Sequence, residues 1–358
     1  MHLGEIRTPA LVVDVDIFEG NVAAMSRALP RDRLRPHVKA WKCTTLARML
    51  FEAGHRGFCC ATLREVEGMA SAGLGEDLLL ANQTLDTARL AAIAGSGTAR
   101  LTVAVDSEDT IRVAAAAGVK EVLIDVNVGM PRCGCQPETA GKLADLARAS
   151  GLDVRGVMGY EGHAVGNPDR GARQEQVDGA VSMLREAYDE VGGEVVSAGG
   201  TGTYDMHDWA SEIQAGSFAL MDAQYALLDL PFRPALFLLA TVISVNPGGY
   251  AVCDGGLKSL GMDHGNPSMQ NGEVWFCSDE HVTFAPSADH PVAVGDLVWL
   301  TPAHVDPTVA RHEHLVIARG PASAADGPRD RSRLGPDNPV ACEEWEVLDA
   351  WDIDLRHW

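Results

Sequence analysis

The feature that most constrains the fold is a regular alternation of short apolar runs with helical stretches through the first two thirds of the chain. Strands that alternate with helices predict βαβ units and parallel pairing. Eight such strands predict a (β/α)8 TIM barrel, with a doubly wound open sheet as the alternative. The predicted strands are residues 35–40, 57–61, 77–81, 101–106, 121–126, 154–159, 195–198 and 217–221.

The sequence changes character beyond about residue 236. Strand-like runs separated by Gly, Pro and Asp replace the alternation, and no long helical pattern occurs, which predicts an antiparallel β domain. We assign residues 15–235 to the barrel, and residues 1–14 with 236–358 to the β domain. Residues 319–341 are polar and rich in Pro and Gly, which predicts a surface loop. The strands predicted outside the barrel are residues 10–16, 238–246, 250–254, 274–277, 298–301, 314–318 and 344–355.

The net charge and the apolar pattern exclude several classes of function. The formal net charge is −21 over 358 residues, whereas binding to nucleic acid phosphates needs clustered Lys and Arg. No apolar run is long enough to span a bilayer, and the first residues do not resemble a signal peptide. The eight cysteines include no CxxC pair, so free thiols are expected. We therefore expect a cytoplasmic protein that binds neither nucleic acid nor membranes.

A short basic stretch, residues 35–42, contains Lys39 at the end of the first predicted strand and Lys42 just beyond it. A buried lysine lowers its pKa readily, and its neutral amine then attacks a carbonyl group to form a Schiff base. Lys39 is therefore a candidate for covalent chemistry. The stretch taken alone fits equally well with a positive rim that only solvates the end of a strand.

Polar residues also follow later strands at their carboxyl ends, where barrel enzymes carry their working residues. Arg132 follows the fifth strand, and Tyr160 and His163 follow the sixth. Arg132 is either a fixed cation beside a ligand oxygen or one half of a surface ion pair. His163 either moves a proton or stacks on a ring, or it is a structural hydrogen-bonding residue.

A glycine-rich run, residues 199–203, follows the seventh predicted strand. Its glycines let backbone N–H groups approach an anion closely, and its threonine hydroxyls add further donors. Barrels commonly bind phosphate after this strand. The run therefore predicts a phosphate site, with an ordinary glycine turn as the alternative.

His304 and Asp306 are separated by one residue in a stretch interpreted as a strand, so their side chains are expected on one face. A nitrogen and an oxygen donor suit Mn, Zn or a similar divalent ion better than Cu(I). The spacing alone is weak evidence, because many surface strands carry it.

Short motifs occur in order along nearly the whole chain: RPHVKxxK, GFCCATLREVE, ANQ, VNVGxxRCG, YxGH, SAGGTGT, ExQxGSxxxMDxxY, DGGLK, SDEH and HVDPT. Together they resemble the D-threonine aldolase and D-serine dehydratase family. These are fold-type III pyridoxal-phosphate enzymes, related to alanine racemase through the barrel. The resemblance implies an alanine racemase-like barrel followed by the β domain, and a homodimer in which the β domain of one chain helps to close the barrel mouth of the other.

The resemblance also implies roles for the candidate residues. Lys39 carries pyridoxal 5'-phosphate through a Schiff base, Arg132 faces the phenolic oxygen of its ring, and Tyr160 lies beside it. His304 and Asp306 hold a divalent metal (Mn, Mg, Co or Zn) beside the β-hydroxyl of the substrate. The implied catalytic residues are Lys39, Tyr160 and His163, and the implied cofactor-binding residues are Lys39, Arg132, Tyr160, Gly200, Thr201, Gly202, Thr203 and Tyr225.

The activity implied is that of a lyase that cleaves D-β-hydroxy amino acids into glycine and an aldehyde, because Asp306, rather than a Cys, is typical of the aldolase branch. A D-serine or D-3-hydroxy amino acid dehydratase, an amino acid racemase and a non-catalytic pyridoxal-phosphate carrier are the alternatives. Two positions depart from the family pattern. Trp41 stands where the motif K-x-H-K has a His, and Gly166 lies near the place where aldolases carry a second His, thought to be the base. If that histidine is missing, His163 or metal-bound water has to take its role, or the reaction differs.

Overall fold

The computed structural model describes residues 2–320 and 344–357 of the chain. The chain folds into two compact units, each assembled from segments that are distant in sequence. One comprises Met1–Ala24 and Ser217–Ile353, and the other comprises Met25–Gly216 with Asp354–Trp358. Most of the loop predicted at residues 319–341 lies outside the described residues. None of the described helices has both the length and the apolar composition needed to cross a membrane.

The unit of residues 25–216, called here the barrel unit, is built on parallel strands that pair in chain order from β2 to β8. Residues 34–37 close the ring, because Leu34 bridges to Ile213 of β8 and His37 bridges to Cys59 of β2, both in parallel. The predicted parallel barrel is thereby confirmed, with residues 34–37 as its first member. Its strands are β2 (Gly57–Cys60), β3 (Asp77–Leu80), β4 (Leu101–Val105), β5 (Glu121–Asp125), β6 (Asp153–Gly159), β7 (Val195–Ala198) and β8 (Glu212–Ile213).

One of the predicted strands is wrong, and another ends earlier than predicted. Residues 217–221 contain a 3-10 turn, Ser217–Ala219, and the last barrel strand is β8 just before it. All five residues of this run are buried, and a short buried run has the same apolar pattern whether it is a strand or a turn. The first predicted strand also ends early, because Val38–Ala40 form a 3-10 turn.

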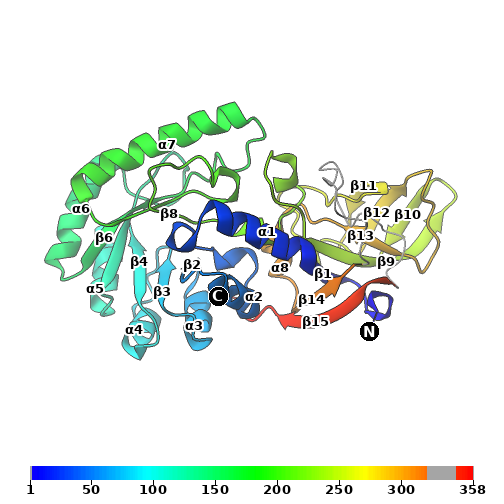
Figure 1. The fold of residues 1–358 in the computed structure, drawn as a ribbon, viewed down its shortest axis with the longest axis horizontal. Helices are drawn as coiled ribbons and strands as arrows, with labels where there is room; N and C mark the ends of the chain where they lie inside the picture. Colours follow the sequence, from blue (N-terminus) through cyan, green and yellow to red (C-terminus); the bar gives the residue numbers. More distant parts are fainter. Residues whose placement is uncertain (1, 321–343, 358) are drawn as a thin grey trace. The chain divides into compact units, whose positions relative to one another are not determined.

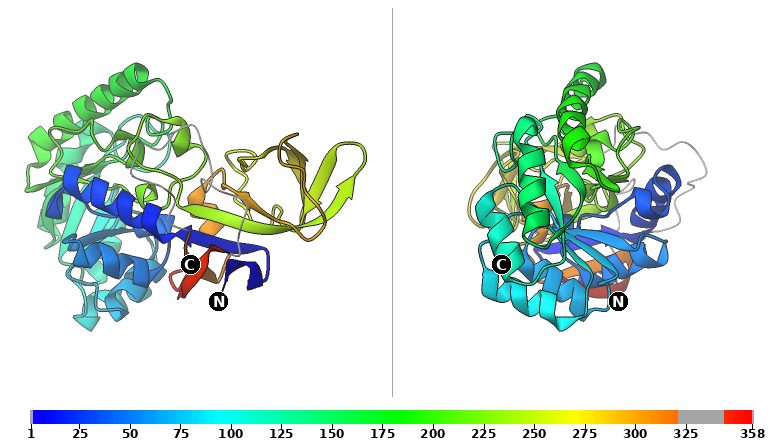
Figure 2. Two further views of the ribbon diagram at one scale, coloured as in Figure 1. Left: turned by 45° about the vertical axis from the view of Figure 1, so that its right-hand side comes forward. Right: turned by 90° about the vertical axis from the view of Figure 1, so that its left-hand side faces the viewer.

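Helices flank the outer side of the barrel strands (Figures 1 and 2). Several begin at a side-chain cap: the Thr62 hydroxyl accepts the amide of Glu65, and the Asp169 carboxylate accepts the amide of Ala172. Helix α1 (Val15–Ala28) runs across the boundary between the two units in sequence. The other helices of the barrel unit are α2 (Thr44–Glu52), α3 (Leu63–Ser71), α4 (Thr87–Ser96), α5 (Glu108–Ala116), α6 (Pro137–Ala149) and α7 (Arg170–Val191).

Paired charges fill the barrel at the amino ends of its strands. Arg35 donates from Nε to Glu212 at 2.7 Å and from its Nη2 to Asp77 at 2.9 Å. Arg155 forms a second ion pair with Asp77 at 3.1 Å. We call Arg35, Asp77, Arg155 and Glu212 the paired-charge layer. Leu79, two positions beyond Asp77, lies on the same face of β3, and it belongs to an apolar cluster with Cys59, Ala104, Leu123, Met158 and Val195.

The other unit, called here the β unit, contains one large sheet in the order β11-β12-β10-β9-β1-β14-β15, with β13 also paired to β9. Every pairing is antiparallel except that of β1 with β14. The predicted antiparallel domain is confirmed, but β12 and the short helix α8 (Val305–Val309) were not predicted. The strands are β1 (Ala10–Asp14), β9 (Leu236–Asn246), β10 (Tyr250–Cys253), β11 (Gly272–Cys277), β12 (Val282–Pro286), β13 (Leu297–Leu300), β14 (His314–Arg319) and β15 (Glu346–Asp352).

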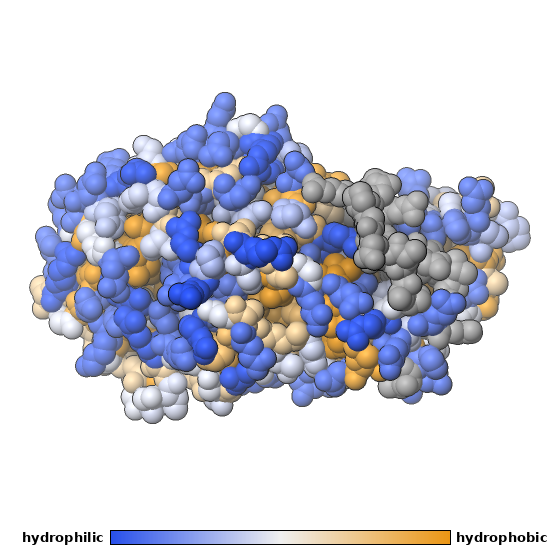
Figure 3. All heavy atoms as spheres, viewed as in Figure 1, coloured by the Kyte–Doolittle hydropathy of each residue, from blue (hydrophilic) through white to orange (hydrophobic). Residues whose placement is uncertain are grey.

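Three aromatic rings pack together in the core of the β unit. Phe237 and Trp299 pack edge to face with ring centroids 5.7 Å apart, and Trp345 packs beside Trp299 at 5.0 Å. The cysteines within the described residues are all free thiols, as predicted, and Cys342 lies outside those residues. Hydrophilic side chains cover much of the face in Figure 3, consistent with the acidic composition.

Candidate active site

Lys39 is positioned by the turn that follows the closing segment of the barrel. Its amide donates to Nδ1 of His37 at 3.4 Å, which starts the 3-10 turn Val38–Ala40. His37 is buried, and burial lowers its pKa well below the ordinary value, helped by the positive charges of Lys39, Lys42 and Arg132. His37 is therefore neutral at physiological pH and acts as a backbone cap. Lys42 lies beyond the turn and forms an ion pair with the buried Glu65.

Tyr160 connects several of the predicted residues. It follows β6, and its ring centroid lies 5.8 Å from Nζ of Lys39 and 5.4 Å from Cζ of Arg132. A Cβ placed on Gly200 would lie 3.3 Å from Cε2 of the same ring. The structure thus brings together Lys39, Arg132, Tyr160 and the glycine turn, which come from four different strand ends.

His163 lies in the loop after β6 and is exposed. Its ring packs over Gly129 in the loop after β5, where an added Cβ would lie 3.0 Å from Cε1. Gly129 also has a φ of +116°, so glycine is required there on two counts. Gly166 is exposed, and a Cβ there would meet no atom within 4 Å. A side chain at position 166 would therefore meet no obstacle at its Cβ.

The predicted phosphate run folds as a compact turn, Thr201–Thr203, directly after β7. The turn is buried, and a Cβ on Gly202 would overlap the backbone carbonyl of Val165. Glycine is therefore obligatory at that position, and a larger residue would disturb the fold as well as the turn. The backbone at Gly202 thus lies too close to Val165 for any residue other than glycine.

Glu161 holds this turn, and its role was not recognised in the sequence. The carboxylate is buried and accepts hydrogen bonds from Thr203 Oγ1 at 2.6 Å, from His207 Nε2 at 2.8 Å and from the Gly199 amide at 3.3 Å. Burial raises the pKa of Glu161, but the hydrogen bonds from His207 and Thr203 outweigh it, so the pKa lies below its ordinary value. The only signal in the sequence that could have identified Glu161 is its position between Tyr160 and His163.

Asp125 ends β5 on the side of the barrel that carries these residues. It is buried and accepts a hydrogen bond from Gln83 Nε2 at 2.7 Å. Burial raises its pKa from 3.8 to about 6, in spite of the hydrogen bond from Gln83. A carboxyl group that titrates near neutrality is often found at functional sites.

The remaining predicted residues, Tyr225, His304 and Asp306, belong to the β unit. The strand expected at 304–306 is wrong: His304 precedes helix α8, and Asp306 lies in its first turn. Buried Asp222 explains the difference, because its carboxylate accepts the amide of Val305 at 3.0 Å and that of Tyr225 at 2.8 Å. Pro307 also favours the first turn of a helix over a strand interior. Asp222 thereby links the turn of Tyr225 to the start of α8.

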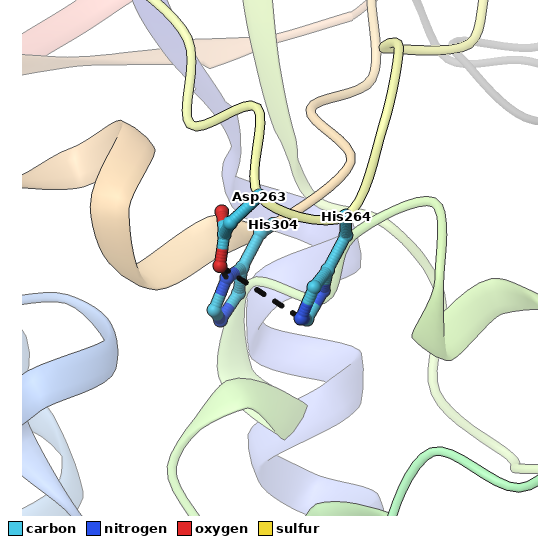
Figure 4. A group of neighbouring side chains, drawn as sticks. All are labelled: Asp263, His264 and His304. Atoms are coloured by element: carbon cyan, nitrogen blue, oxygen red, sulfur yellow. Dashed lines mark hydrogen bonds and ion pairs between the residues drawn. The ribbon is translucent and has the colours of Figure 1, made fainter.

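A group of three potential metal ligands lies around His304 (Figure 4). Its other members are Asp263 and His264, in the loop after β10, and one ligand atom of each residue lies within 4.8 Å of the others. Asp263 Oδ2 lies 2.6 Å from His304 Nδ1, and the two histidine rings stack at 4.0 Å with an angle of 8° between their planes. The sequence motif HVDPT identified His304, but its neighbours come from a loop 41 residues away.

Comparisons with known proteins cover almost the whole chain. The family model "Alanine racemase, N-terminal domain" matches residues 13–223, and "Putative serine dehydratase domain" matches residues 235–318. A D-threonine aldolase of Arthrobacter sp is 33% identical over 88% of this chain and 90% of its own length. A 3-hydroxy-D-aspartate aldolase of Paracoccus denitrificans is 30% identical over 89% and 90%.

Further similarities extend to a dehydratase and to a solved structure. A D-threo-3-hydroxyaspartate dehydratase of Delftia sp. is 28% identical over 72% of this chain and 73% of its own. The crystal structure of D-threonine aldolase from Filomicrobium marinum has a TM-score of 0.87 and 30% identity, and covers 99% of this chain and 97% of that one.

Proposed function

The chain belongs to the alanine racemase N-terminal domain family, and from this premise we propose that it is a pyridoxal-phosphate- and divalent-metal-dependent lyase that cleaves D-β-hydroxy amino acids into glycine and an aldehyde. The similarity to D-threonine aldolases over nearly the full chain supports the reaction class. The grouping of Lys39, Arg132 and Gly200 around the Tyr160 ring is the observation that carries the proposal.

The residues present fit pyridoxal phosphate. Lys39 offers the amine, Arg132 a fixed cation, and Tyr160 an aromatic face between them. The turn of Gly200, Thr201, Gly202 and Thr203 offers a phosphate site. No residue larger than glycine fits at Gly202. Tyr225 is proposed as a further phosphate contact. When bound, the cofactor supplies an electron sink for the substrate carbon, and the chain's own residues orient it and exclude water.

The donor set at the start of α8 fits a divalent ion. His304 and Asp306 offer an imidazole nitrogen and a carboxylate oxygen, which suit Mn, Zn, Co or Mg better than a soft metal. A bound ion would lower the pKa of a hydroxyl group beside it. We propose Tyr160 and His163 as the residues that hold and move protons, with an imidazole nitrogen of His163 as the acceptor for the β-hydroxyl proton.

Product analysis tests the proposal. The full-length protein is incubated with pyridoxal phosphate, Mn²⁺ and a panel of D-β-hydroxy amino acids, and glycine with aldehyde is measured against keto acid with ammonia. An aldolase forms the first pair, and exhaustive treatment with EDTA abolishes turnover while the visible absorbance of bound cofactor and the thermal stability stay nearly unchanged. Formation of the second pair would support the dehydratase alternative, which the Delftia relative favours. Undiminished turnover after chelation would point to a racemase.

The missing histidine allows a sharper test of the proton acceptor. Position 166 can accept a side chain without a clash at its Cβ, because no atom lies within 4 Å of a Cβ built on Gly166. If His163 serves in place of the absent residue, His163→Ala should lose activity, and the double variant with Gly166→His should recover part of it. Gly166→Ala is the matched control and should recover none.

Two further expectations remain proposals. We expect a homodimer, and full activity in a sedimenting monomer at assay concentration would contradict it. The cytoplasmic location expected from the sequence also stays a prediction.

A further inference from the structure

The loop that carries Asp263 and His264 lies against the histidine proposed as a metal ligand (Figure 4). We propose that Asp263 is a positioning residue of the metal site, which holds the His304 ring in the tautomer that leaves Nε2 as the ligand atom. The inference rests on the proposed function, because His304 is a ligand only in that proposal. It adds a residue that neither the HVDPT motif nor the strand pattern indicated.

The hydrogen bond between the two side chains determines the tautomer. A carboxylate only accepts hydrogen bonds, and Asp263 Oδ2 lies 2.6 Å from Nδ1 of His304. Nδ1 therefore carries the proton, and the lone pair of the neutral ring resides on Nε2. Ligating histidines usually donate their other ring N–H to such an acceptor, which fixes the ring orientation and raises the basicity of the ligand nitrogen.

The stacked ring of His264 argues against a site in which all three side chains bind one ion. A metal lies close to the plane of each imidazole that binds it, about 2.0–2.1 Å from the nitrogen. The two rings are stacked, with centroids 4.0 Å apart and 8° between their planes, so the planes do not meet near the ring nitrogens. One ion cannot lie in both planes, so His264 covers the face of His304 without sharing its metal.

The loop is held in place by bonds within the β unit. The Gly265 amide donates to the Met262 carbonyl at 3.2 Å, and Gly265 has a φ of +101° that favours glycine. The Gln224 side chain donates to the His264 carbonyl at 3.3 Å. Gln224 precedes Tyr225 in the turn that Asp222 ties to α8. Asp263 therefore meets His304 from a loop that is fixed relative to α8.

Metal affinity of the purified full-length protein tests this assignment, with Mn²⁺ alone as the probe in an electron paramagnetic resonance titration. Asp263→Ala should weaken Mn²⁺ binding about 10- to 100-fold. Asp263→Asn should lose less, because its side-chain carbonyl still accepts from Nδ1. The matched control is Asp352→Ala, which breaks another Asp–His pair of the β unit, with His314 at 2.9 Å, and should leave the affinity unchanged.

His304→Ala separates failure of the inference from failure of the proposed metal site. Unchanged Mn²⁺ binding in this variant would overturn the metal site itself. If binding is lost there but is unchanged in Asp263→Ala, the positioning role alone is wrong. If Asp263→Asn loses as much affinity as His304→Ala, Asp263 is itself a ligand and the inference is overturned. Should Asp263→Ala fail to fold, Asp263→Leu replaces it in the same titration, because a leucine side chain cannot accept from Nδ1.

Discussion

The arginines at the two ends of the barrel differ in their contacts. At the amino ends of the strands, buried Arg35 is satisfied by Glu212 and Asp77, and Arg155 shares Asp77. At the carboxyl ends, Arg132 is exposed and, within the described residues, has no carboxylate at ion-pair distance. Its contact is the Tyr160 ring, 5.4 Å away. The comparison shows that the cations at one end are neutralised within the fold, whereas Arg132 at the other end faces an aromatic ring, as expected if it binds the proposed ligand.

Lys39→Ala should produce the largest effect, and it should be on activity. Loss of the covalent anchor is expected to lower turnover at least about 1,000-fold, equivalent to about 4 kcal/mol of activation free energy. The free energy of unfolding should change by less than about 1 kcal/mol. Release of aldehyde measures turnover, visible absorbance reports the bound cofactor, and urea unfolding measures the free energy of unfolding. Lys42→Arg, which retains a cation for Glu65, is the control and should keep the absorbance. Borohydride-trapped cofactor on Lys42 in the Lys39→Ala variant would show that the wrong lysine was assigned.

Arg35→Met, at the amino ends of the strands, should lower the free energy of unfolding. It leaves Glu212 and Asp77 without their main cation in a buried layer, and breaking a buried ion pair in this way costs about 3–5 kcal/mol. Urea unfolding measures the loss. Arg112→Met, which breaks an exposed pair with Asp109 on α5, should cost less than about 0.5 kcal/mol. A similarly small loss for Arg35→Met would remove the distinction between the two ends.

Glu161→Gln sharpens the comparison, because Glu161 is a fully paired carboxylate at the functional end. Removing its charge weakens the hydrogen bonds from His207 and Thr203. We expect the free energy of unfolding to fall by about 1–3 kcal/mol and pyridoxal phosphate to bind about 10-fold more weakly, as the loosened turn no longer holds its donors. Urea unfolding and cofactor titration measure these effects. Glu138→Gln on the exposed face of α6 is the control. Normal cofactor affinity in Glu161→Gln would mean that the turn does not depend on this anchor.

Asp125→Asn should have the smallest effect, visible in the pH dependence of stability. Burial raises the pKa of Asp125 to about 6. Between pH 4 and 6 the native protein then binds more protons at this group than the unfolded chain, so its contribution to the free energy of unfolding falls as the pH rises. The variant lacks this contribution and should be the more stable of the two proteins at pH 7. Unfolding of both proteins from pH 4 to 7 measures the difference, with Asp145→Asn at an exposed position as the control. A variant whose stability parallels the wild type across this range would contradict the assignment.

Local patterns were sufficient for much of the architecture. The apolar runs at β2 to β7 alternate with amphipathic helices, and that periodicity depends only on neighbouring residues. The same local reasoning failed at residues 217–221 and at His304, where it predicted strands. In the first case a buried turn has the same apolar composition as a buried strand. In the second, the Asp222 carboxylate, far away in sequence, accepts the amide that begins α8.

The sequence by itself determined the order of strands and helices, the position of Lys39 at a strand end and the glycines of the turn after β7, because each depends on residues close together in the chain. Only the tertiary structure decided where the barrel closes, at bridges from Leu34 to Ile213 and from His37 to Cys59. It also decided that Asp263 meets His304. Such contacts join residues separated by tens to hundreds of positions, and their geometry follows from the packing of whole elements, which no local periodicity encodes.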